Sequence, residues 1–254
     1  MKVIILSQND PLYTHFFFKR FVKEYAHQFD LQAVYLLAPM KDSLADLVRR
    51  TWEFYGPADF VRVGLQYARI KLREKLGHPV TPHNLLKKHG IAVEQIASVN
   101  SRSFLARVRE HKPDVIVSVS CPQIFRQDLL SIPSTAALNI HSGKLPAYKG
   151  LFPNFWQMLN GESTSTVTIH EMVAKVDEGR IISETEIPIH PDMSLTGLIR
   201  ETKEAAVPAL FNVIRDYEQG SIKPFVNSEL TPGYFRFPAR RDVTEFRNKG
   251  LRLL

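Results

Sequence analysis

Two residues near the middle of this 254-residue chain, Asn139 and His141, combine side chains that can do chemistry together. They close an apolar run of strand length, and side chains in a strand alternate between faces, so both are expected on the same side. An amide donates hydrogen bonds without titrating, whereas an imidazole can donate, accept or exchange a proton. Such a pair suits a developing oxyanion and the proton transfer beside it. Asp177, 36 residues after His141 in a predicted turn, supplies the carboxylate that could orient the imidazole.

The residue types alone leave a second interpretation open, because Asn-x-His at the end of a strand also fits a purely structural contact. The surrounding elements favour a ligand site. Apolar and β-branched runs predict strands at residues 2–6, 31–38, 91–97, 113–120 and 135–140. Helical patterns lie between them, at residues 11–29, 41–76 and 101–111. This alternation predicts an α/β fold with a Rossmann-like open, mostly parallel sheet, whose ligands bind beyond the carboxyl ends of the strands.

In the second half of the chain, two predicted strands are joined by a turn, and a long helix follows them. Residues 166–172 and 180–187 are predicted strands on either side of the turn Asp177-Glu178-Gly179. Residues 194–218 are a predicted helix that Pro208 is expected to bend or interrupt. Residues 1–220 are expected to form the main domain and residues 221–254 a small C-terminal appendage. The sequence has no G-x-G-x-x-G, P-loop, H-E-x-x-H or G-x-S-x-G motif, which excludes the cofactor and hydrolase classes that those motifs mark.

Three motifs follow one another in residues 113–187. The segment NIHSGKLPAYKG runs from Asn139 to Gly150, the helical segment PNFWQMLNG from Pro153 to Gly161, and the Asp-x-Gly turn begins at Asp177. In their order, their spacing and the Gly and Pro residues that bound them, these motifs resemble those of the N10-formyltetrahydrofolate-dependent formyltransferase family. That family includes methionyl-tRNA, glycinamide ribonucleotide and sugar-nucleotide formyltransferases, and this chain looks closest in build to the compact sugar N-formyltransferases.

The resemblance implies the formyltransferase fold and a catalytic trio of Asn139, His141 and Asp177. An amine would attack the formyl carbon of N10-formyltetrahydrofolate, the co-substrate, with no metal involved. Asn139 and a positively charged His141 would stabilise the oxyanion. Asp177 would raise the pKa of the imidazole and help to remove the amine proton through water.

The resemblance also places the folate against the loop of residues 118–126 and the turn of residues 173–178. Ile124 and Phe125 offer apolar surface for a flat ring, although packing at the start of a helix explains them equally well. The other residues expected along the folate are Cys121, interpreted as a small buried filler, Val173, Ala174 and Val176.

Departures from the family's pattern bear on the acceptor amine. Ser142-Gly143 stands where many relatives have Pro-Ser, and the first strand is followed by Ser7 to Pro11 instead of a glycine-rich phosphate loop. Only residues 221–254 follow the core, where methionyl-tRNA enzymes carry a larger β-barrel. These departures favour a nucleotide-linked amino sugar, with tRNA-linked methionine or a metabolite amine as alternatives. The residues expected to meet this small, anionic acceptor are Gln8, Lys144, Tyr148 and Lys149, although ordinary surface charge also explains the two lysines.

The composition bounds the remaining possibilities. Lys and Arg number 33 against 26 Asp and Glu, a net charge of +7, and 44% of residues are hydrophobic, which excludes disorder. One Cys excludes an internal disulfide, and no stretch offers the roughly 20 apolar residues of a membrane span, so a cytoplasmic location is expected. Nucleic acid is not an expected partner, and a homodimer is left open.

Much of the positive charge lies in one basic amphipathic segment, residues 62–75. Docking to a membrane surface or a partner fits this segment, and so does a solvated polar face. Outside enzymes, the alternative is a non-catalytic basic binding protein that keeps the fold. The intact set of Asn139, His141 and Asp177 argues against it.

Overall fold

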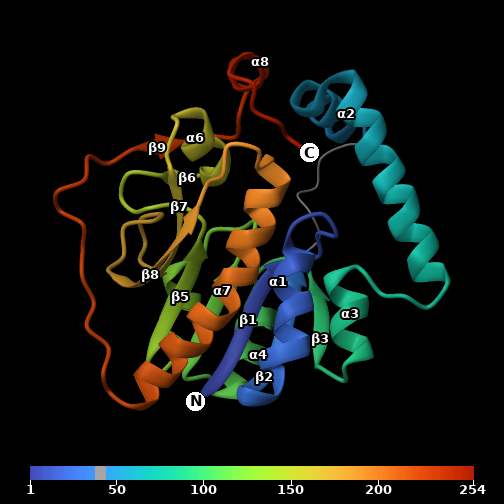
Figure 1. Cartoon of the computed structure of the whole chain (residues 1–254). Coiled ribbons are helices and arrows are strands. Elements are labelled where there is room, and N and C mark those ends of the chain that lie inside the picture. The colour runs from blue at the N-terminus through green and yellow to red at the C-terminus, as the bar shows by residue number, and fades with distance from the viewer. Residues whose placement is uncertain (38–43) are drawn as a thin grey trace.

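A seven-stranded sheet forms the centre of the computed structural model, which describes residues 1–37 and 44–254 (Figure 1). Its strand order is β3-β2-β1-β4-β5-β7-β8. The strands are β1 (Lys2–Gln8), β2 (Asp30–Leu37), β3 (Val93–Ile96), β4 (Val115–Val119), β5 (Ala136–His141), β7 (Thr164–Glu171) and β8 (Ile181–Pro188). The helices are α1 (Thr14–Arg20), α2 (Leu44–Lys75), α3 (Pro82–Lys88), α4 (Arg102–His111), α5 (Gln127–Leu130), α6 (Pro153–Leu159), α7 (Leu195–Glu218) and α8 (Arg240–Asn248).

The strand directions confirm the predicted fold class. β3, β2, β1, β4 and β5 pair in parallel, and β7 and β8 continue the sheet antiparallel to β5 and to each other. The chain starts at β1, builds outward to β3, and then returns to place β4 on the other side of β1. This reversal brings the carboxyl ends of β1, β4 and β5 next to one another, which is where open α/β sheets bind their ligands.

Helices cover both faces of the sheet, because alternate side chains of each strand point to opposite sides. On one face, Val3 and Ile5 belong to a core cluster with side chains of α1 and α7. On the other face, Ile4 and Leu6 pack with side chains of α4 and α5. All of β4 is buried, as its continuous apolar sequence predicts for a strand covered on both faces.

The helix starts follow their capping residues. The Ser101 hydroxyl accepts the Phe104 N–H and opens α4, as predicted, and the Ser194 hydroxyl accepts the Gly197 N–H and opens α7. α7 continues through Pro208 without a break. After α1 the chain makes a wide π turn over Phe21–Tyr25 and a short 3₁₀ turn over Ala26–Gln28 before β2.

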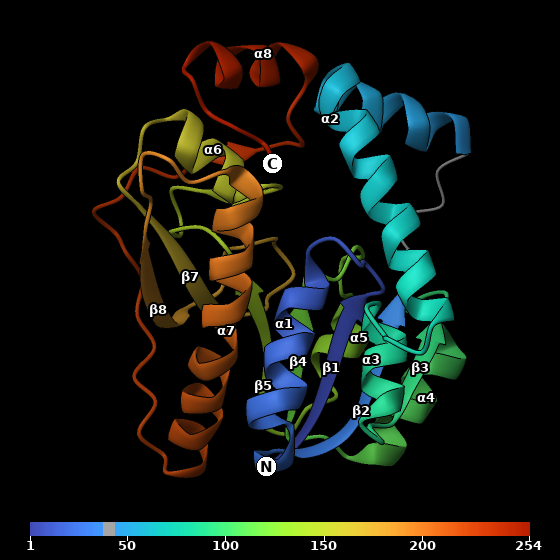
Figure 2. The same cartoon turned by 45° about the vertical axis from the view of Figure 1, so that its right-hand side comes forward.

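α2 differs from its prediction in an informative way. The predicted strand end at Ala38 and helix start at residues 41–43 lie outside the described residues. Gly56 has φ 63° and is followed by Pro57, so α2 consists of two helical segments joined by a break. The second segment runs along the outer edge of the molecule (Figure 2).

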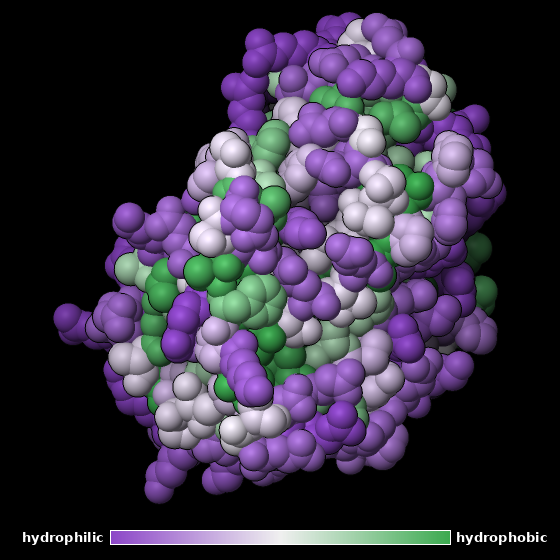
Figure 3. Space-filling model, turned by 60° about the vertical axis from the view of Figure 1, so that its left-hand side comes forward, coloured by the Kyte–Doolittle hydropathy of each residue, from purple (hydrophilic) through white to green (hydrophobic). Residues whose placement is uncertain are grey.

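The C-terminal residues 221–254 lie along the body of the fold. β9 (Tyr234–Phe235) pairs with β6 (Lys149–Gly150), the Leu195 N–H donates to the Arg252 carbonyl, and Phe246 stacks on Phe155 at 4.7 Å. Figure 3 shows the face around β8 and this segment, where apolar groups lie between hydrophilic side chains. The domain boundary at residue 220 stays a prediction.

Candidate active site

The carboxyl-terminal half of β5 carries both Asn139 and His141 on one face of the sheet. The register pairs Asn139 with Ser118 of β4 on one side and with His170 of β7 on the other. The site is therefore framed by a parallel neighbour and an antiparallel one. The loops after β4 and β7 reach it from both sides.

His141 is almost fully buried, and each of its ring nitrogens faces an oxygen atom. Its Nε2–H donates to the Tyr148 carbonyl at 2.6 Å, and its Nδ1 lies 3.9 Å from Oδ2 of Asp177. A neutral ring with the proton on Nε2 leaves Nδ1 as the nitrogen that can take up a further proton. The predicted neighbourhood of His141 and Asp177 is thus present in the fold.

The charge expected on His141 differs from what its surroundings favour. Burial lowers the pKa of His141 below 6.5, and the nearby carboxylate of Asp177 and the Tyr148 carbonyl only partly oppose this. The positive charge of Lys203 acts in the same direction as burial. His141 is therefore neutral at pH 7, because desolvation outweighs the attraction of Asp177.

Asp177 lies in the turn after β7 with a left-handed φ of 54°. Its Oδ2 accepts the Gly150 N–H at 2.8 Å, and its Oδ1 lies 3.6 Å from Nε2 of His170. Burial alone would raise the pKa of Asp177, but its contacts with His170 and His141 and the Gly150 N–H lower it to about 2. The side chain is a carboxylate at neutral pH.

The turn after β7 also depends on Gly179. A Cβ atom at this position would overlap the Glu171 carbonyl, so only glycine allows the two ends of the turn to approach this closely. The Asp-x-Gly pattern thus has a steric basis. The glycine closes the turn, and the turn directs Asp177 inward.

His170 belongs to the site, although no role there was predicted for it. Its Nδ1–H donates to the Glu171 carbonyl at 2.8 Å, which leaves Nε2 free to accept a hydrogen bond from the Asn139 amide at 3.1 Å. This contact fixes which way the amide points. The proximity of His170 to Asn139 depends on the pairing of β5 with β7, and short sequence patterns do not predict that pairing.

Lys203 is a second group that the sequence analysis passed over. It projects from α7, is 7% exposed, and donates from Nζ to the Ser120 hydroxyl at 2.6 Å. Burial lowers its pKa to about 8, opposed by the charge of Asp10. A visible signal existed: Lys203 stands between Ile199 and Ala206 on the apolar face of a helix.

Ser120 directly follows β4 and adopts the left-handed region, with φ 52°, within the loop 118–126 that was predicted to meet the folate. A left-handed conformation costs energy for a non-glycine residue and persists only where its surroundings hold it. The hydrogen bond from Lys203 is one such constraint. Lys203 therefore ties this loop to α7.

The departure at Ser142-Gly143 also has a structural reason. A Cβ atom at Gly143 would lie 2.7 Å from Cβ of Pro153 and 3.1 Å from Nε2 of His141. The Ser142 carbonyl accepts from Gln157 at 3.1 Å, and the Gly143 carbonyl accepts from Thr168 at 2.8 Å. The loop therefore packs tightly beside the imidazole.

The residues predicted along the folate fall into exposed and buried groups. Ile124 is 67% exposed, and Val173, Ala174 and Val176 are also exposed. Phe125 instead packs in the core with side chains of α4 and β1, so its ring face is not available. Burial raises the pKa of the Cys121 thiol to about 12, in keeping with its interpretation as an unreactive filler.

The residues predicted to meet the acceptor are mostly engaged within the protein. Lys144 lies 3.6 Å from Glu186, and the largely covered Lys149 lies 3.3 Å from Glu178. The Tyr148 hydroxyl donates to Glu162 at 2.5 Å and its ring stacks on Phe235, so its backbone carbonyl is the part that contacts His141. Gln8 is partly buried at the end of β1.

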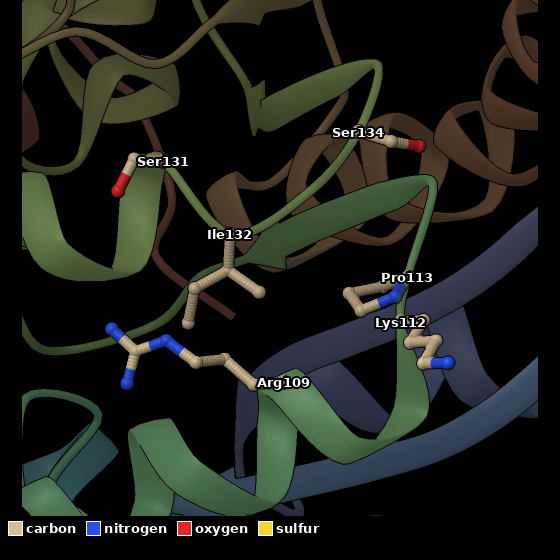
Figure 4. A pocket seen from close by; sticks show the side chains of 6 residues that line it. All are labelled: Arg109, Lys112, Pro113, Ser131, Ile132 and Ser134. Atoms are coloured by element: carbon tan, nitrogen blue, oxygen red, sulfur yellow. The ribbon is translucent and has the colours of Figure 1, made fainter.

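One surface depression is separate from this site. It is lined by Arg109, Lys112 and Pro113 before β4 and by Ser131, Ile132 and Ser134 before β5 (Figure 4). These residues precede the strands, so the depression lies at the edge of the sheet opposite Asn139 and His141. Within residues 1–37 and 44–254, no group of three or more His, Cys, Asp and Glu residues could hold a metal ion. No helix in these ranges is long and apolar enough to cross a membrane.

Comparison with known proteins shows to which family the chain belongs. The family model described as formyl transferase matches residues 35–214. The chain belongs to the formyl transferase family. This match spans β4, β5 and the turn at Asp177, and so includes the segments from which the resemblance was predicted.

Among curated relatives of this family member, the methionyl-tRNA formyltransferase of Geobacter metallireducens is 37% identical over 134 residues. The match covers 53% of this chain and 43% of that protein, so the chain spans less than half of its relative's length. The shared segment agrees with membership of the formyl transferase family.

Solved structures share the fold at low sequence identity. A sugar N-formyltransferase from Shewanella sp. FDAARGOS_354 matches with a TM-score of 0.60 and 19% identity, covering 97% of this chain and 87% of that one. Glycinamide ribonucleotide transformylase 1 from Symbiobacterium toebii has a TM-score of 0.61, 14% identity and coverage of 89% and 94%. An N-formyltransferase from Helicobacter canadensis, in complex with folinic acid and dTDP-3-aminofucose, has a TM-score of 0.58, 17% identity and coverage of 95% and 72%.

Proposed function

We propose that this protein transfers a formyl group from N10-formyltetrahydrofolate to a primary amine, with Asn139, His141 and Asp177 as its catalytic residues. The observation that carries the proposal is the convergence of these side chains at the carboxyl end of β5. An imidazole lies between a carboxylate at 3.9 Å and a carbonyl at 2.6 Å, next to an oriented amide.

Asn139 would act as the oxyanion donor. Its amide nitrogen carries two hydrogens, and the contact with His170 uses one of them. The other hydrogen is available to the oxygen of the formyl group. Because His170 already holds the amide in place, little reorganisation is needed when negative charge develops on that oxygen.

His141 would act as a proton acceptor that is neutral at rest. Attack by an amine generates an ammonium group, and Nδ1 of His141 is the open position for its proton, directly or through a water molecule. Once protonated, the ring has a hydrogen-bond acceptor on each side, the Asp177 carboxylate and the Tyr148 carbonyl. Asp177 therefore stabilises the imidazolium as it forms, and it fixes the orientation of the ring. When the tetrahedral intermediate collapses, the bond between the formyl carbon and N10 breaks, and the imidazolium gives its proton to N10, so that tetrahydrofolate leaves as a neutral amine.

The exposed apolar residues support the predicted site for the donor. Ile124 lies on the loop after β4, and Val173 and Val176 lie on the turn that carries Asp177. Cys121 from the first segment and Met172 beside the second both pack against the same core cluster, so the two segments border one region of the fold. A flat pterin ring would gain from burial against their aliphatic groups.

For the acceptor, we propose the amino group of a nucleotide-linked sugar. The similarity to the Shewanella sugar N-formyltransferase extends over 97% of the chain and so includes the C-terminal segment. The Helicobacter canadensis protein, crystallised with an amino sugar linked to dTDP, has the same fold. Lys144, whose side chain is 39% exposed, is the cation that we expect to meet a diphosphate.

The test is turnover with N10-formyltetrahydrofolate and a set of nucleotide-linked amino sugars, glycinamide ribonucleotide and methionyl-tRNA. Release of tetrahydrofolate is followed by absorbance, and the formylated product is identified by mass spectrometry. Turnover with an amino sugar supports the full proposal, and turnover with another amine replaces only its acceptor. Absence of turnover with every amine, in protein that binds folate, would favour a non-catalytic binding protein.

Donor binding can be measured independently of the acceptor, with 5-formyltetrahydrofolate as the probe. Ile124→Asp places a charge on the proposed apolar surface and is expected to weaken binding about tenfold or more. Val226→Asp, at an exposed residue of the C-terminal segment, is the matched control. Equal affinities in the two variants would remove Ile124 from the donor site.

A second acceptor is favoured by one observation, the 37% identity to a methionyl-tRNA formyltransferase over 134 residues. Recognition of tRNA would use the net charge of +7 and would weaken steeply as salt rises, through release of counterions. Titration of methionyl-tRNA at two salt concentrations tests this. No binding at low salt eliminates tRNA as the acceptor.

A further inference from the structure

The second segment of α2 exposes the apolar side chains that sequence periodicity would assign to a core. Val61 is 59% exposed, Leu65 54%, Leu72 58% and Leu76 66%, and Ala68 between them is also exposed. At about 100° per residue, these five positions form one narrow stripe along the helix, about 22 Å long. We call Val61, Leu65, Ala68, Leu72 and Leu76 the outer stripe.

The opposite side of the same helix attaches it to the protein. Val63 is 3% exposed and Ile70 8%, and both pack in a cluster with Leu12, Phe54 and Tyr55. Because Val63 and Ile70 lie about 180° round the helix from the outer stripe, that stripe points away from the body. Figures 1 and 2 show this part of α2 at the margin of the molecule, so a flat surface could approach it.

Basic residues border the outer stripe on both sides. Arg62, Arg69 and Arg73 follow one edge, and Lys71 and Lys75 follow the other, as the helical repeat places them. All five are exposed. Within the described ranges, Arg69, Lys71, Arg73 and Lys75 form no ion pair, and Arg62 pairs with Asp59 at 3.0 Å.

The acidic residues of this segment lie on its inner side and are engaged there. Asp59 also pairs with Arg247 of α8 at 3.1 Å, and Glu74 accepts hydrogen bonds from the N–H and hydroxyl groups of Thr81. Residues 57–76 contain no other Asp or Glu. The outer side of the segment is therefore apolar along its centre and purely cationic along its edges.

This charge pattern indicates which kind of partner would bind the outer stripe. A second copy of the chain, docked stripe to stripe, would bring the Arg and Lys rows of the two copies against each other, which opposes association. An anionic lipid surface satisfies the whole pattern, because aliphatic side chains enter the boundary of the acyl chains while Arg and Lys extend to the phosphates. It requires no matching shape, and a helix at the margin of the molecule can lie flat on it.

We propose that the outer stripe of α2 and its flanking Arg and Lys residues bind this protein to an anionic lipid surface, with α2 lying in the plane of that surface. The interaction is peripheral, with the helix at the depth of the headgroups. It also accounts for the cluster of positive charge at residues 62–75, which formyl transfer does not use. The proposal does not depend on the identity of the acceptor.

The test is co-sedimentation of the full chain with vesicles of phosphatidylcholine alone and of phosphatidylcholine with phosphatidylglycerol. Binding is expected only with the anionic vesicles and is expected to weaken as salt is raised. Replacing Arg69, Lys71 and Lys75 together by Gln should lower partitioning about a hundredfold, at about 1 kcal/mol for each basic residue. A triple control, Lys23→Gln with Lys87→Gln and Lys88→Gln, removes the same charge from exposed positions elsewhere and should retain binding.

The apolar contribution is tested by Leu65→Gln with Leu72→Gln, which should abolish most of the binding without changing net charge. Thermal melts check that the fold survives, and Leu76→Gln at the end of the helix serves as a milder second variant. Equal binding to neutral and anionic vesicles, or equal losses in the two charge triples, would overturn the proposal. So would unchanged binding in the Leu variants. A dimer in sedimentation velocity that the Leu variants dissociate would assign the stripe to a second copy instead.

Discussion

Asn139 and His170 occupy directly paired positions on the antiparallel strands β5 and β7, and the amide of the first donates to Nε2 of the second at 3.1 Å. The Nδ1–H of His170 is committed to the Glu171 carbonyl at 2.8 Å. The histidine therefore presents a lone pair to the amide, and the amide in turn presents its remaining hydrogen to the site. An aligned donor of this kind is what an oxyanion needs.

Replacing Asn139 by Ala should lower kcat about 10²–10³-fold, the usual cost of one oxyanion donor. Replacing His170 by Ala should cost less, because the amide remains but loses its orientation, and should lower kcat more than it changes KM. Steady-state kinetics checks both changes, with Ser131→Ala at the opposite edge of the sheet as control. Near-normal turnover of Asn139→Ala would remove it from the catalytic set.

The dependence of kcat on pH should report the buried imidazole. Burial holds the pKa of His141 below 6.5, so a reaction that needs the neutral ring should be constant near pH 7 and fall at lower pH. The Asp177 carboxylate raises the pKa of His141, so Asp177→Asn should move this acid limb to lower pH while it lowers the maximal rate. A shift of the limb to higher pH would contradict the assignment.

Lys203→Met should act mainly on binding of the folate donor. It removes the charge-assisted hydrogen bond that holds the strained Ser120 at the start of the loop 120–126. A rise of about tenfold in the donor KM, with a smaller change in kcat, is expected. Lys223→Met, at an exposed residue, is the matched control, and a variant with normal donor KM would show that Ser120 holds its conformation without the lysine.

Gly143→Ala tests the fit of the loop beside the imidazole. The added Cβ would lie 2.7 Å from Cβ of Pro153 and 3.1 Å from Nε2 of His141, so the loop must move and the imidazole beside it must adjust. A fall of about tenfold or more in kcat is expected, because misplacement of a catalytic group by about an ångström is costly. Gly197→Ala, whose Cβ would meet its neighbours at an ordinary 3.5 Å, should have little effect.

Stability should decrease in mild acid because of His15 on α1. Burial, with a smaller contribution from the charge of Lys19, lowers the pKa of His15 to about 4, whereas the unfolded value is about 6.5. Between these values the unfolded chain binds more protons, so the free energy of unfolding falls as pH drops from about 6.5 to about 4. Chemical denaturation of His15→Gln should show a flatter pH profile than His78→Gln, which alters an exposed position.

The local elements and their succession along the chain were accessible from the sequence, because they depend on short patterns. The continuous apolar run before Ser120 identified a strand covered on both faces, and Ser101 identified the start of a helix. The outer stripe shows the limit of such patterns. Its spacing correctly predicted a helix, but spacing cannot say which face a neighbouring element will cover, and Val63 and Ile70 are the residues that α2 buries.

Only part of the candidate site could be predicted from the sequence, because some of its contacts join elements that are distant along the chain. Asn139 and His141 share a strand, so their proximity follows from alternation, and the Asp-x-Gly turn was recognisable as a motif. His170 and Lys203 reach the site through the register of β7 and the packing of α7, which are tertiary facts. The charge of His141 depends on how deeply the protein buries it. Phe125 packs in the core against residues of α4 and β1, which are distant from it in sequence.

Residues of α8, distant in sequence, contact the break in α2. Arg247 of α8 donates to the Tyr55 carbonyl, 192 residues earlier, and Phe246 beside it enters the same cluster as Phe54 and Tyr55. At about 5–20 residues per second, a ribosome needs roughly 10–40 s to make the chain between these partners. During that time Phe54 and Tyr55 can pack on Leu12, Phe152 and Phe155 but lack Phe246, so part of this aromatic surface stays uncovered until α8 has been made. Chaperone contacts during translation should therefore concentrate on this surface and end only when α8 is released.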